Sequence, residues 1–283
     1  MSVYVGLDIG GTKIMAASAG SDGEIIERLR EDTPVDLNEG LDLVKRLVRR
    51  LSSDEEIMAL GAAIGGPLDW QEGIVSPLHQ PQWRNVPLKT IMEDEFKCPF
   101  YVDVDTNVGA LGEYQFTDVS ARRLMYLTIS TGMGGGFIID GQIYRGEDGA
   151  HPEVAHQAVN YRCRYPQRVN CECGASDCLE ALVSGNGIRR IYQKPAEQLT
   201  DDEWEEVGYN LGQGLRNLAT ILVPELFVLG GGIATGAKEK LLQPARKVMV
   251  DKVKIVPIPE ICLSKLGYES ALRGAIALAM QAA

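Results

Sequence analysis

Three cysteines and two nearby histidines are the residues whose types and spacing most directly suggest chemistry. Cys171, Cys173 and Cys178 lie on one short stretch, and His151 and His156 precede it. Thiolate sulfur and imidazole nitrogen are preferred zinc ligands, and three cysteines with one histidine complete a closed tetrahedral set of the kind found in structural sites. The alternative is that the thiols stay free or that two of them form a disulfide.

A second group of candidate residues combines a carboxylate with glycine-rich turns. Asp8 is followed by two glycines and Thr12, and a similar turn begins at Thr131. Backbone N–H groups approach phosphate oxygens closely only where side chains are absent, and glycine permits that approach. Asp8 could also hold Mg²⁺ through water, because this ion keeps most of its hydration shell. The alternative is that both segments are ordinary hairpin turns.

A third candidate is Asp105, which lies between an apolar run and a segment with helical spacing. A carboxylate acts as a general base when it lies within hydrogen-bond reach of a substrate hydroxyl. The alternative is that Asp105 caps the following helix, a role that aspartate often fills.

The elements that must position these residues alternate between strands and helices. Apolar runs predict strands over residues 3–9, 13–19, 24–30, 57–64, 100–104, 123–130, 137–140, 142–145 and 227–229. Helical spacing predicts helices over residues 38–51, 88–96, 106–116, 203–222, 237–250 and 270–281, and residues 68–87 predict an ordered loop. A strand that ends in a glycine-rich turn and leads to a second strand occurs twice. The pattern therefore predicts an α/β fold with two related halves.

The motifs at these turns resemble those of a known superfamily. Residues 8–12, 131–135 and 228–232 are similar to the two phosphate motifs and the adenosine motif of the sugar kinase, actin and heat-shock ATPase superfamily. Within it, residues 149–156 followed by residues 171–180 resemble the ROK family of repressors and sugar kinases.

The resemblance extends from residue 3 to about residue 279 and implies a fold. We expect two α/β domains of the RNase H-like, actin-like ATPase type, with an interdomain active-site cleft that closes on the sugar. The first domain would comprise residues 1–115 and 268–283, and the second, with the zinc loop and a homodimer surface, residues 116–267.

The resemblance also implies a role for each candidate residue. Asp105 would be the catalytic base, and His156 rather than His151 would be the histidine that binds structural zinc. One nitrogen of His156 would bind the ion and the other would face the sugar. The sugar would be bound by Gly66, Asp105, Glu153, His156 and Glu180. ATP and Mg²⁺ would be bound by Asp8, Gly10, Gly11, Thr12, Lys13, Thr131, Gly132, Gly134, Gly135, Gly231 and Gly232.

The sequence departs from the family's pattern at three positions. Val104 stands where the family has an asparagine that contacts the 3- and 4-hydroxyls of the sugar. Valine can neither donate nor accept a hydrogen bond, so discrimination at these carbons should weaken unless another residue, such as Asp103, compensates. Ala155 and Asp177 replace glycines, and nothing in the sequence indicates what these two changes do.

The function implied by the resemblance is phosphorylation of the 6-hydroxyl of glucose or a related hexose by ATP. N-acetylmannosamine, N-acetylglucosamine and fructose are alternative substrates, and polyphosphate is an alternative donor. The alternative of a different class is a sugar-sensing regulatory protein. Family repressors carry a helix-turn-helix before the first phosphate motif, and we expect none here, because Asp8 lies almost at the start of the chain.

The composition excludes several other classes of protein. The 283 residues include 28 Lys and Arg against 39 Asp and Glu, and a net charge of −11 argues against a nucleic-acid partner. No apolar run approaches the ~20 residues that cross a bilayer, and the first residues lack the pattern of a signal peptide. These exclusions lead us to expect a cytoplasmic protein with no membrane partner, and the family resemblance implies an enzyme of carbohydrate metabolism, within glycolysis.

Overall fold

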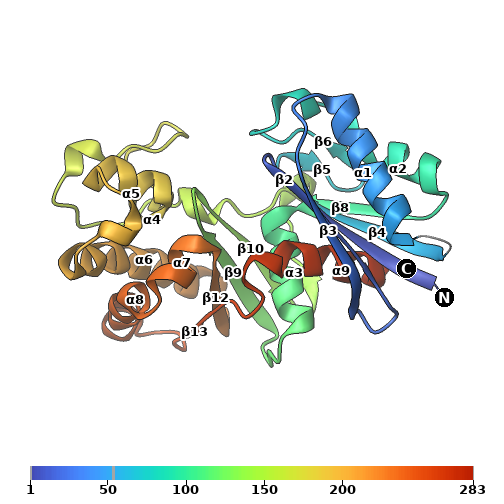
Figure 1. Cartoon of the computed structure of the whole chain (residues 1–283). Helices are drawn as coiled ribbons and strands as arrows, with labels where there is room; N and C mark the ends of the chain where they lie inside the picture. Colours follow the sequence, from blue (N-terminus) through green and yellow to red (C-terminus); the bar gives the residue numbers. More distant parts are fainter. Residues whose placement is uncertain (1, 53–54, 283) are drawn as a thin grey trace. The chain divides into compact units, whose positions relative to one another are not determined.

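The chain folds into two units, each with its own five-stranded sheet (Figure 1). The computed structural model describes residues 2–52 and 55–282. The first unit comprises the described residues within Met1–Val119, Arg145–His151 and Glu269–Ala283, and the second comprises Ser120–Tyr144 and Pro152–Tyr268. The predicted α/β class is confirmed. The segment Arg145–His151 falls inside the range predicted for the second domain, yet its contacts group it with the first unit.

The sheet of the first unit has the strand order β3–β2–β1–β4–β8. Its strands are β1 (Ser2–Ile9), β2 (Lys13–Ala19), β3 (Ile25–Asp32), β4 (Glu56–Ile64) and β8 (Phe100–Val104). The first three form an antiparallel meander, whereas β1, β4 and β8 run parallel. The carboxyl ends of these three parallel strands therefore meet at one edge of the sheet, which is where open α/β sheets bind ligands.

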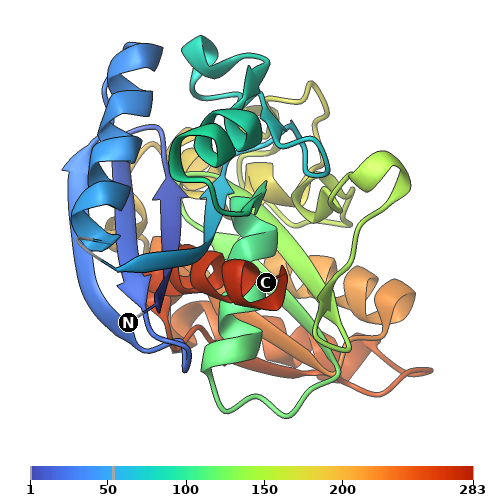
Figure 2. The same ribbon diagram turned by 90° about the vertical axis from the view of Figure 1, so that its right-hand side faces the viewer.

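Helices cover both faces of this sheet. They are α1 (Leu37–Ser52), α2 (Leu88–Phe96), α3 (Asp105–Phe116) and α9 (Ser270–Ala282). Neighbouring residues of β2 point to opposite faces, so that Ala16 packs in the cluster with α1 and Ala17 in the cluster with α9. Figure 2 shows α9 in red beside the blue strands that it contacts. A Cβ on Gly61 of β4 would lie 1.9 Å from the Ala275 carbonyl oxygen, so only glycine lets α9 approach so closely.

Two local predictions for the first unit need correction. The helix predicted over residues 38–51 begins one residue earlier, at Leu37, and the carboxylate of Asp36 accepts hydrogen bonds from the N–H groups of Asn38 and Glu39 at 2.9 and 3.1 Å. Residues 68–87, predicted as a loop, form a small antiparallel sheet. Its strands are β5 (Leu68–Asp69), β6 (Ile74–Val75) and β7 (Val86–Pro87).

The sheet of the second unit has the order β11–β10–β9–β12–β13. Its strands are β9 (Arg123–Ile129), β10 (Met133–Ile139), β11 (Gln142–Ile143), β12 (Leu226–Gly230) and β13 (Glu260–Leu263). The hairpin of β9 and β10 repeats the hairpin of β1 and β2, and β12 then pairs parallel to β9 as β4 does to β1. The predicted repetition of a strand, glycine-rich turn and strand is therefore confirmed.

The helices of the second unit share one hydrophobic core with its sheet. They are α4 (Leu179–Val183), α5 (Gly185–Tyr192), α6 (Asp201–Leu222), α7 (Gly231–Ala237) and α8 (Glu239–Lys252). The single helix predicted over 237–250 begins later, because Lys238 has a left-handed φ of 50° that separates α7 from α8. Single 3₁₀ turns occupy η1 (Pro81–Trp83), η2 (Glu147–Gly149), η3 (Val154–His156), η4 (Pro166–Arg168), η5 (Ala196–Gln198) and η6 (Gly267–Glu269). Within the described residues, no helix has the length and apolarity needed to span a bilayer.

Candidate active site and metal centre

Three of the candidate site residues lie at the carboxyl edge of the parallel strands in the first unit. Asp8 is the penultimate residue of β1, Gly66 follows β4 and Asp105 follows β8. Asp8 and Asp105 are close enough that the charge of Asp105 affects the ionisation of Asp8. The topology thus brings together two carboxylates and a backbone position that are far apart in the sequence.

Asp105 is exposed and is the first residue of α3. The N-cap position belongs to Val104, whose side chain makes no capping hydrogen bond, so the alternative that Asp105 is the cap residue is wrong. One oxygen of Asp105 accepts a hydrogen bond from the backbone N–H of Thr106 at 2.7 Å. An exposed carboxylate in this position is accessible to a substrate hydroxyl and can accept its proton.

Asp103 cannot compensate for Val104, contrary to the possibility raised from the sequence. Its side chain is 3 % exposed. Its Oδ2 atom accepts two hydrogen bonds from the Arg145 guanidinium, that from Nε being 3.0 Å long. Its Oδ1 atom accepts from Asn107 Nδ2 at 2.9 Å and from the Val104 N–H at 2.6 Å. Both oxygens are therefore engaged inside the protein, and neither is available to a sugar.

The first glycine-rich turn joins β1 to β2. The Gly10 N–H donates to the Lys13 carbonyl at 3.0 Å, and the Thr33 hydroxyl donates to the Gly10 carbonyl at 2.7 Å. Gly11 and Thr12 are exposed at the tip, where their N–H groups can meet an anion. The Lys13 ammonium is half-exposed and lies 3.8 Å from the Asp32 carboxylate. The turn is thus fixed at its base and open at its tip.

Asp8 is only partly accessible, and burial together with the nearby charge of Asp105 raises the pKa of its carboxyl from 3.8 to about 7. A nearby cation stabilises the ionised form of a carboxyl group in such surroundings. The residues present therefore fit Mg²⁺, which Asp8 would hold through water beside the phosphate turn.

Replacing Asp8 with Asn should stabilise the Mg²⁺-free protein above neutral pH. Because the folded-state pKa lies above the unfolded value, Asp8 contributes stability below pH ~4 that is lost as pH rises to about 7. We expect the free energy of unfolding of Asp8→Asn, relative to the wild type, to be about 2.5 kcal/mol greater at pH 8 than at pH 5. Urea denaturation of both proteins at the two pH values, without added Mg²⁺, measures these free energies. An equal difference between the two proteins at pH 5 and pH 8 would contradict a raised pKa for Asp8.

The second glycine-rich turn joins β9 to β10 in the second unit. The N–H groups of Gly185 and Asn186, at the start of α5, donate to the carbonyls of Ser130 and Thr131 at 2.7 and 2.9 Å. Thr131 is exposed and Gly132 is partly exposed. These contacts fix the turn against the start of α5.

Gly135, a predicted phosphate contact, is buried in this hairpin. A Cβ at this position would lie 2.7 Å from Val154 Cγ2 and 2.8 Å from a Leu127 methyl carbon. Close packing alone therefore explains this glycine, whereas Gly134 is partly exposed on the same strand.

The third glycine-rich turn opens α7. Gly231 has a φ of +83°, and a Cβ there would lie 2.4 Å from the Ile129 carbonyl oxygen, so that glycine is required for both reasons. A Cβ on Gly232 would lie 3.1 Å from the hydroxyl of Tyr268, whose side chain is exposed. The sequence did not single out this aromatic ring beside the turn.

Two carboxylates flank the imidazole of His156 in the second unit. The Nε2 atom lies 3.9 Å from Glu153 Oε2, and Nδ1 lies 3.7 Å from Glu180 Oε2. The other oxygen of Glu180 accepts a hydrogen bond from the Met133 N–H at 3.2 Å, which links this group to the second glycine-rich turn. The three candidate sugar-binding side chains of this unit are therefore neighbours.

The four predicted metal ligands converge in the second unit. One donor atom from each of His156, Cys171, Cys173 and Cys178 lies within 4.8 Å of all the others. The Cys171 Sγ atom is 3.4 Å from His156 Nδ1, and the sulfurs of Cys173 and Cys178 are 3.4 Å apart. These separations are close to the ~3.5–3.8 Å edges of a tetrahedron built from Zn–S bonds of about 2.3 Å. His151 is not part of this set.

The ionisation of these thiols is linked to metal binding. No disulfide joins Cys171, Cys173 and Cys178, so the disulfide alternative is not realised. Burial raises the pKa of the Cys171 and Cys178 thiols, whereas a hydrogen bond from the Ala175 backbone lowers the pKa of Cys173 to about 7. The thiolate is the form that binds metal. A bound cation would therefore stabilise the ionised form of the two buried sulfurs.

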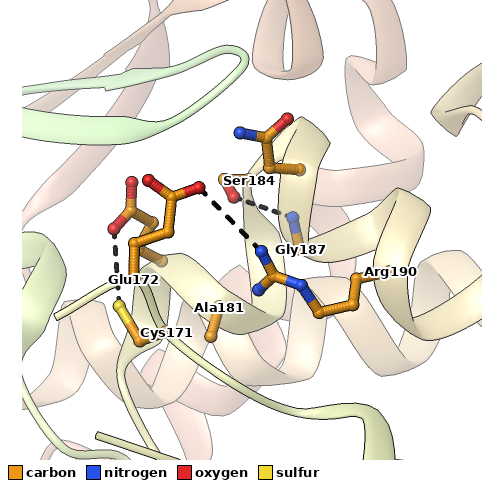
Figure 3. Close-up of a pocket in the computed structure, with 8 residues that line it drawn as sticks. Cys171, Glu172, Ala181, Ser184, Gly187 and Arg190 are labelled. Atoms are coloured by element: carbon orange, nitrogen blue, oxygen red, sulfur yellow. Dashed lines mark hydrogen bonds and ion pairs between the residues drawn. The ribbon is translucent and has the colours of Figure 1, made fainter. Parts of the chain in front are cut away.

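A pocket lies beside this cluster, as Figure 3 shows, between the cysteine loop and α5. Its walls include Cys171, Ser184 and Arg190, and the Glu180 carboxylate lies 3.6 Å from the Cys171 sulfur. The Ser184 hydroxyl accepts a hydrogen bond from the Gly187 N–H at 3.1 Å and so caps α5. The pocket thus adjoins both the metal ligands and one candidate sugar-binding residue.

Comparisons with known proteins agree on one family. A family model described as the ROK family matches residues 4–282. A glucokinase of Halalkalibacterium halodurans is 30 % identical over 284 residues, which cover 86 % of this chain and 84 % of that protein.

Two solved structures resemble the fold over nearly its whole length. A ROK hexokinase of Thermus thermophilus has 28 % identity and a TM-score of 0.86, and the match covers 99 % of this chain and 98 % of that one. A ROK family glucokinase of Streptomyces griseus, solved with glucose and AMPPNP, has 27 % identity and a TM-score of 0.78, with 99 % of both chains covered.

Proposed function

This chain belongs to the ROK family, and we propose on that premise that it transfers the γ-phosphate of ATP to the 6-hydroxyl of glucose or a closely related hexose. The observation that supports this proposal most directly is the exposed Asp105 carboxylate, at the same sheet edge as Asp8 and its glycine-rich turn. The similarity to a ROK hexokinase and to a glucokinase solved with glucose and a nucleotide analogue supports the class of reaction.

In this proposal Asp105 accepts the proton of the 6-hydroxyl as the oxygen attacks phosphorus. Phosphoryl transfer gives the protein little covalent chemistry to perform, so positioning and charge stabilisation supply most of the rate. Gly66 and Asp105 in the first unit, with Glu153, His156 and Glu180 in the second, would hold the sugar hydroxyls. Carboxylates and imidazole suit this task because they accept or donate hydrogen bonds in fixed directions.

The nucleotide would be held by the backbone of the two phosphate turns. Exposed N–H groups near Gly11 and Thr12, and near Thr131 and Gly132, provide positive ends of peptide dipoles in a chain whose net charge is negative. Asp8 would hold Mg²⁺, which neutralises phosphate charge when bound.

The four-ligand cluster would hold zinc as a structural ion. Three cysteines and one histidine leave no open position for a substrate, which is the property of structural zinc sites. Because His156 Nδ1 faces the sulfurs and Nε2 faces Glu153, the ion would fix the imidazole for contact with the sugar. A homodimer in the cytoplasm is also part of the proposal, and only the family resemblance supports it.

The choice of sugar can be tested by comparing kcat/KM for glucose, mannose, galactose, fructose and the two N-acetylhexosamines in an assay of ADP release. We expect glucose or a close epimer to be the best substrate. We also expect Val104→Asn to increase the discrimination between glucose and galactose by about tenfold, because an amide can hydrogen-bond a hydroxyl that valine cannot.

An unchanged glucose-to-galactose ratio in Val104→Asn would show that another group already sets this selectivity. A fructose or N-acetylhexosamine optimum would replace the proposed substrate while keeping the reaction. If no sugar stimulates ADP release, yet glucose still binds by calorimetry, the sugar-sensing alternative holds instead.

A further inference from the structure

The junction between β8 and α3, where Asp105 lies, is held by the buried carboxylate of Asp103. Its Oδ1 atom accepts hydrogen bonds from the Val104 N–H at 2.6 Å and from Asn107 Nδ2 at 2.9 Å. Val104 is the last residue of β8, and Asn107 lies in the first turn of α3. Because the two donors lie on either side of Asp105 in the chain, one oxygen atom ties the end of the strand to the start of the helix around the proposed base.

Two other polar groups of this first turn make no tie of their own. Asn107 is fully buried, and within the part of the chain that the structure describes neither its Oδ1 atom nor the Thr106 hydroxyl has a hydrogen-bond partner. The side chain of Val104, at the N-cap position, makes no capping hydrogen bond. The position of the first turn relative to β8 therefore depends on how the Asp103 carboxylate is oriented.

Arg145 fixes that orientation from a distant part of the chain. Its Nε atom donates to Asp103 Oδ2 at 3.0 Å, and its Nη2 atom donates to the same oxygen. Two charge-assisted hydrogen bonds from one rigid guanidinium constrain the direction of a carboxylate as well as neutralising it. A carboxylate as deeply buried as that of Asp103 is also costly to leave without a cationic partner.

The guanidinium of Arg145 is itself held in place by an aromatic ring. It lies 4.1 Å from the centre of the Trp70 ring, and Trp70 belongs to the turn that joins β5 to β6. This turn is fixed because the Asp69 carboxylate accepts hydrogen bonds from the N–H groups of Gln71 and Glu72 at 3.0 and 3.1 Å. A continuous set of contacts thus leads from a tight turn through Trp70, Arg145 and Asp103 to the residues that flank Asp105.

We propose that Arg145 is a positioning residue, which acts through Asp103 to place the Asp105 carboxylate for the 6-hydroxyl of the sugar. This inference rests on the proposed function, in which Asp105 is the general base. Arg145 itself neither touches the sugar nor moves a proton. Proton transfer and attack require reacting atoms about 3–3.5 Å apart, and a displacement of about 1 Å costs on the order of a hundredfold in rate.

The test places Arg145→Met in the wild type and in Asp105→Asn and measures ADP release at saturating glucose. In the wild type we expect kcat to fall by about 10- to 100-fold, with the KM for ATP nearly unchanged, because other segments bind the nucleotide in this proposal. In Asp105→Asn, whose own kcat is already low, Arg145→Met should lower it further by less than about twofold. The carboxylate that Arg145 positions is then absent, so the two losses should not add.

Arg273→Met is the matched control. Arg273 belongs to the same unit, its side chain is 19 % exposed against 20 % for Arg145, and it also combines an ion pair, with Glu269 at 3.8 Å, with an aromatic ring, that of Phe116 at 5.5 Å. Phe116 lies at the opposite end of α3 from Asp105. We expect Arg273→Met to keep the wild-type kcat even if its midpoint of thermal unfolding falls.

Arg145→Lys keeps the inference testable if Arg145→Met does not fold. Lysine retains the positive charge that the buried Asp103 needs, but its ammonium cannot reproduce the planar pair of donors, so kcat should fall several-fold in the wild type and stay unchanged in Asp105→Asn. An equal fractional loss of kcat in both backgrounds would assign Arg145 a general structural role and overturn the inference. A wild type without sugar-stimulated ADP release, or an Asp105→Asn variant with the wild-type kcat, would refute the proposed function and this inference with it.

Discussion

Replacing Asp105 with Asn lowers kcat by about a thousandfold if this carboxylate is the general base, within the range of about 10²–10⁴ that such groups contribute. Asparagine keeps the size and one oxygen of the side chain but cannot accept the proton of the 6-hydroxyl. Asp105 is exposed, and asparagine keeps an oxygen that can accept from the Thr106 N–H as Asp105 does at 2.7 Å, so the loss should appear in catalysis and not in folding. The rate of ADP release at saturating glucose and ATP measures it.

Asp201→Asn is the matched control for this experiment. Asp201 is also an exposed aspartate at the first position of a helix, α6, and its carboxylate pairs with Lys240 on the surface at 2.9 Å. We expect this variant to keep the wild-type kcat. Calorimetry should show that Asp105→Asn still binds glucose within a few-fold of the wild-type Kd. A kcat within twofold of the wild type in Asp105→Asn would exclude Asp105 as the base.

Replacing Cys178 with Ala should remove one of four ligands and release most of the bound zinc. Structural zinc sites contribute on the order of 10 kcal/mol in small peptides, and a smaller share should apply here because the loop also packs on the core of the second unit. A decrease of about 3–5 kcal/mol in the free energy of unfolding would lower the midpoint of thermal unfolding by about 10 °C in a unit of this size. Elemental analysis and calorimetry measure the two effects.

Cys163→Ala separates loss of a ligand from loss of a buried thiol. Cys163 lies eight residues before the cluster, is partly buried and is not one of the converging ligands. We expect the Cys163→Ala variant to keep one zinc ion per chain and to change the midpoint of thermal unfolding by only a few degrees. Wild-type protein that contains no transition metal, and whose midpoint does not rise when zinc is added, would refute the zinc assignment.

Loss of the ion should also weaken sugar binding. His156 contacts both the ligand set through Nδ1 and Glu153 through Nε2, so the orientation of the ring depends on what its Nδ1 atom binds. We expect the glucose KM of Cys178→Ala to rise several-fold more than that of Cys163→Ala. Equal KM values in the two variants would show that the ion supports the fold without orienting a sugar contact.

The sequence by itself determined the features that depend on residues close together in the chain. The two hairpins with glycine-rich turns follow from the residues at their tips, and the three cysteines of the ligand set lie within eight residues. Asp105 could be placed at a strand-to-helix junction because the hydrophobic pattern changes there from one period to another. Local backbone geometry and side-chain chemistry were sufficient in each case.

Only the tertiary structure decided which distant residues serve or constrain the site. Asp103 meets Arg145 across 42 positions, and Met133 meets Glu180 across 47, because strand order and helix packing set these distances. The same packing engages Asp103 inside the protein and brings His151 beside Gly66 and Val104. Hydrophobic periodicity specifies which face of an element is buried, but many arrangements of elements bury the same faces, so contacts between distant polar residues emerge only when the sheet order and helix crossings are fixed.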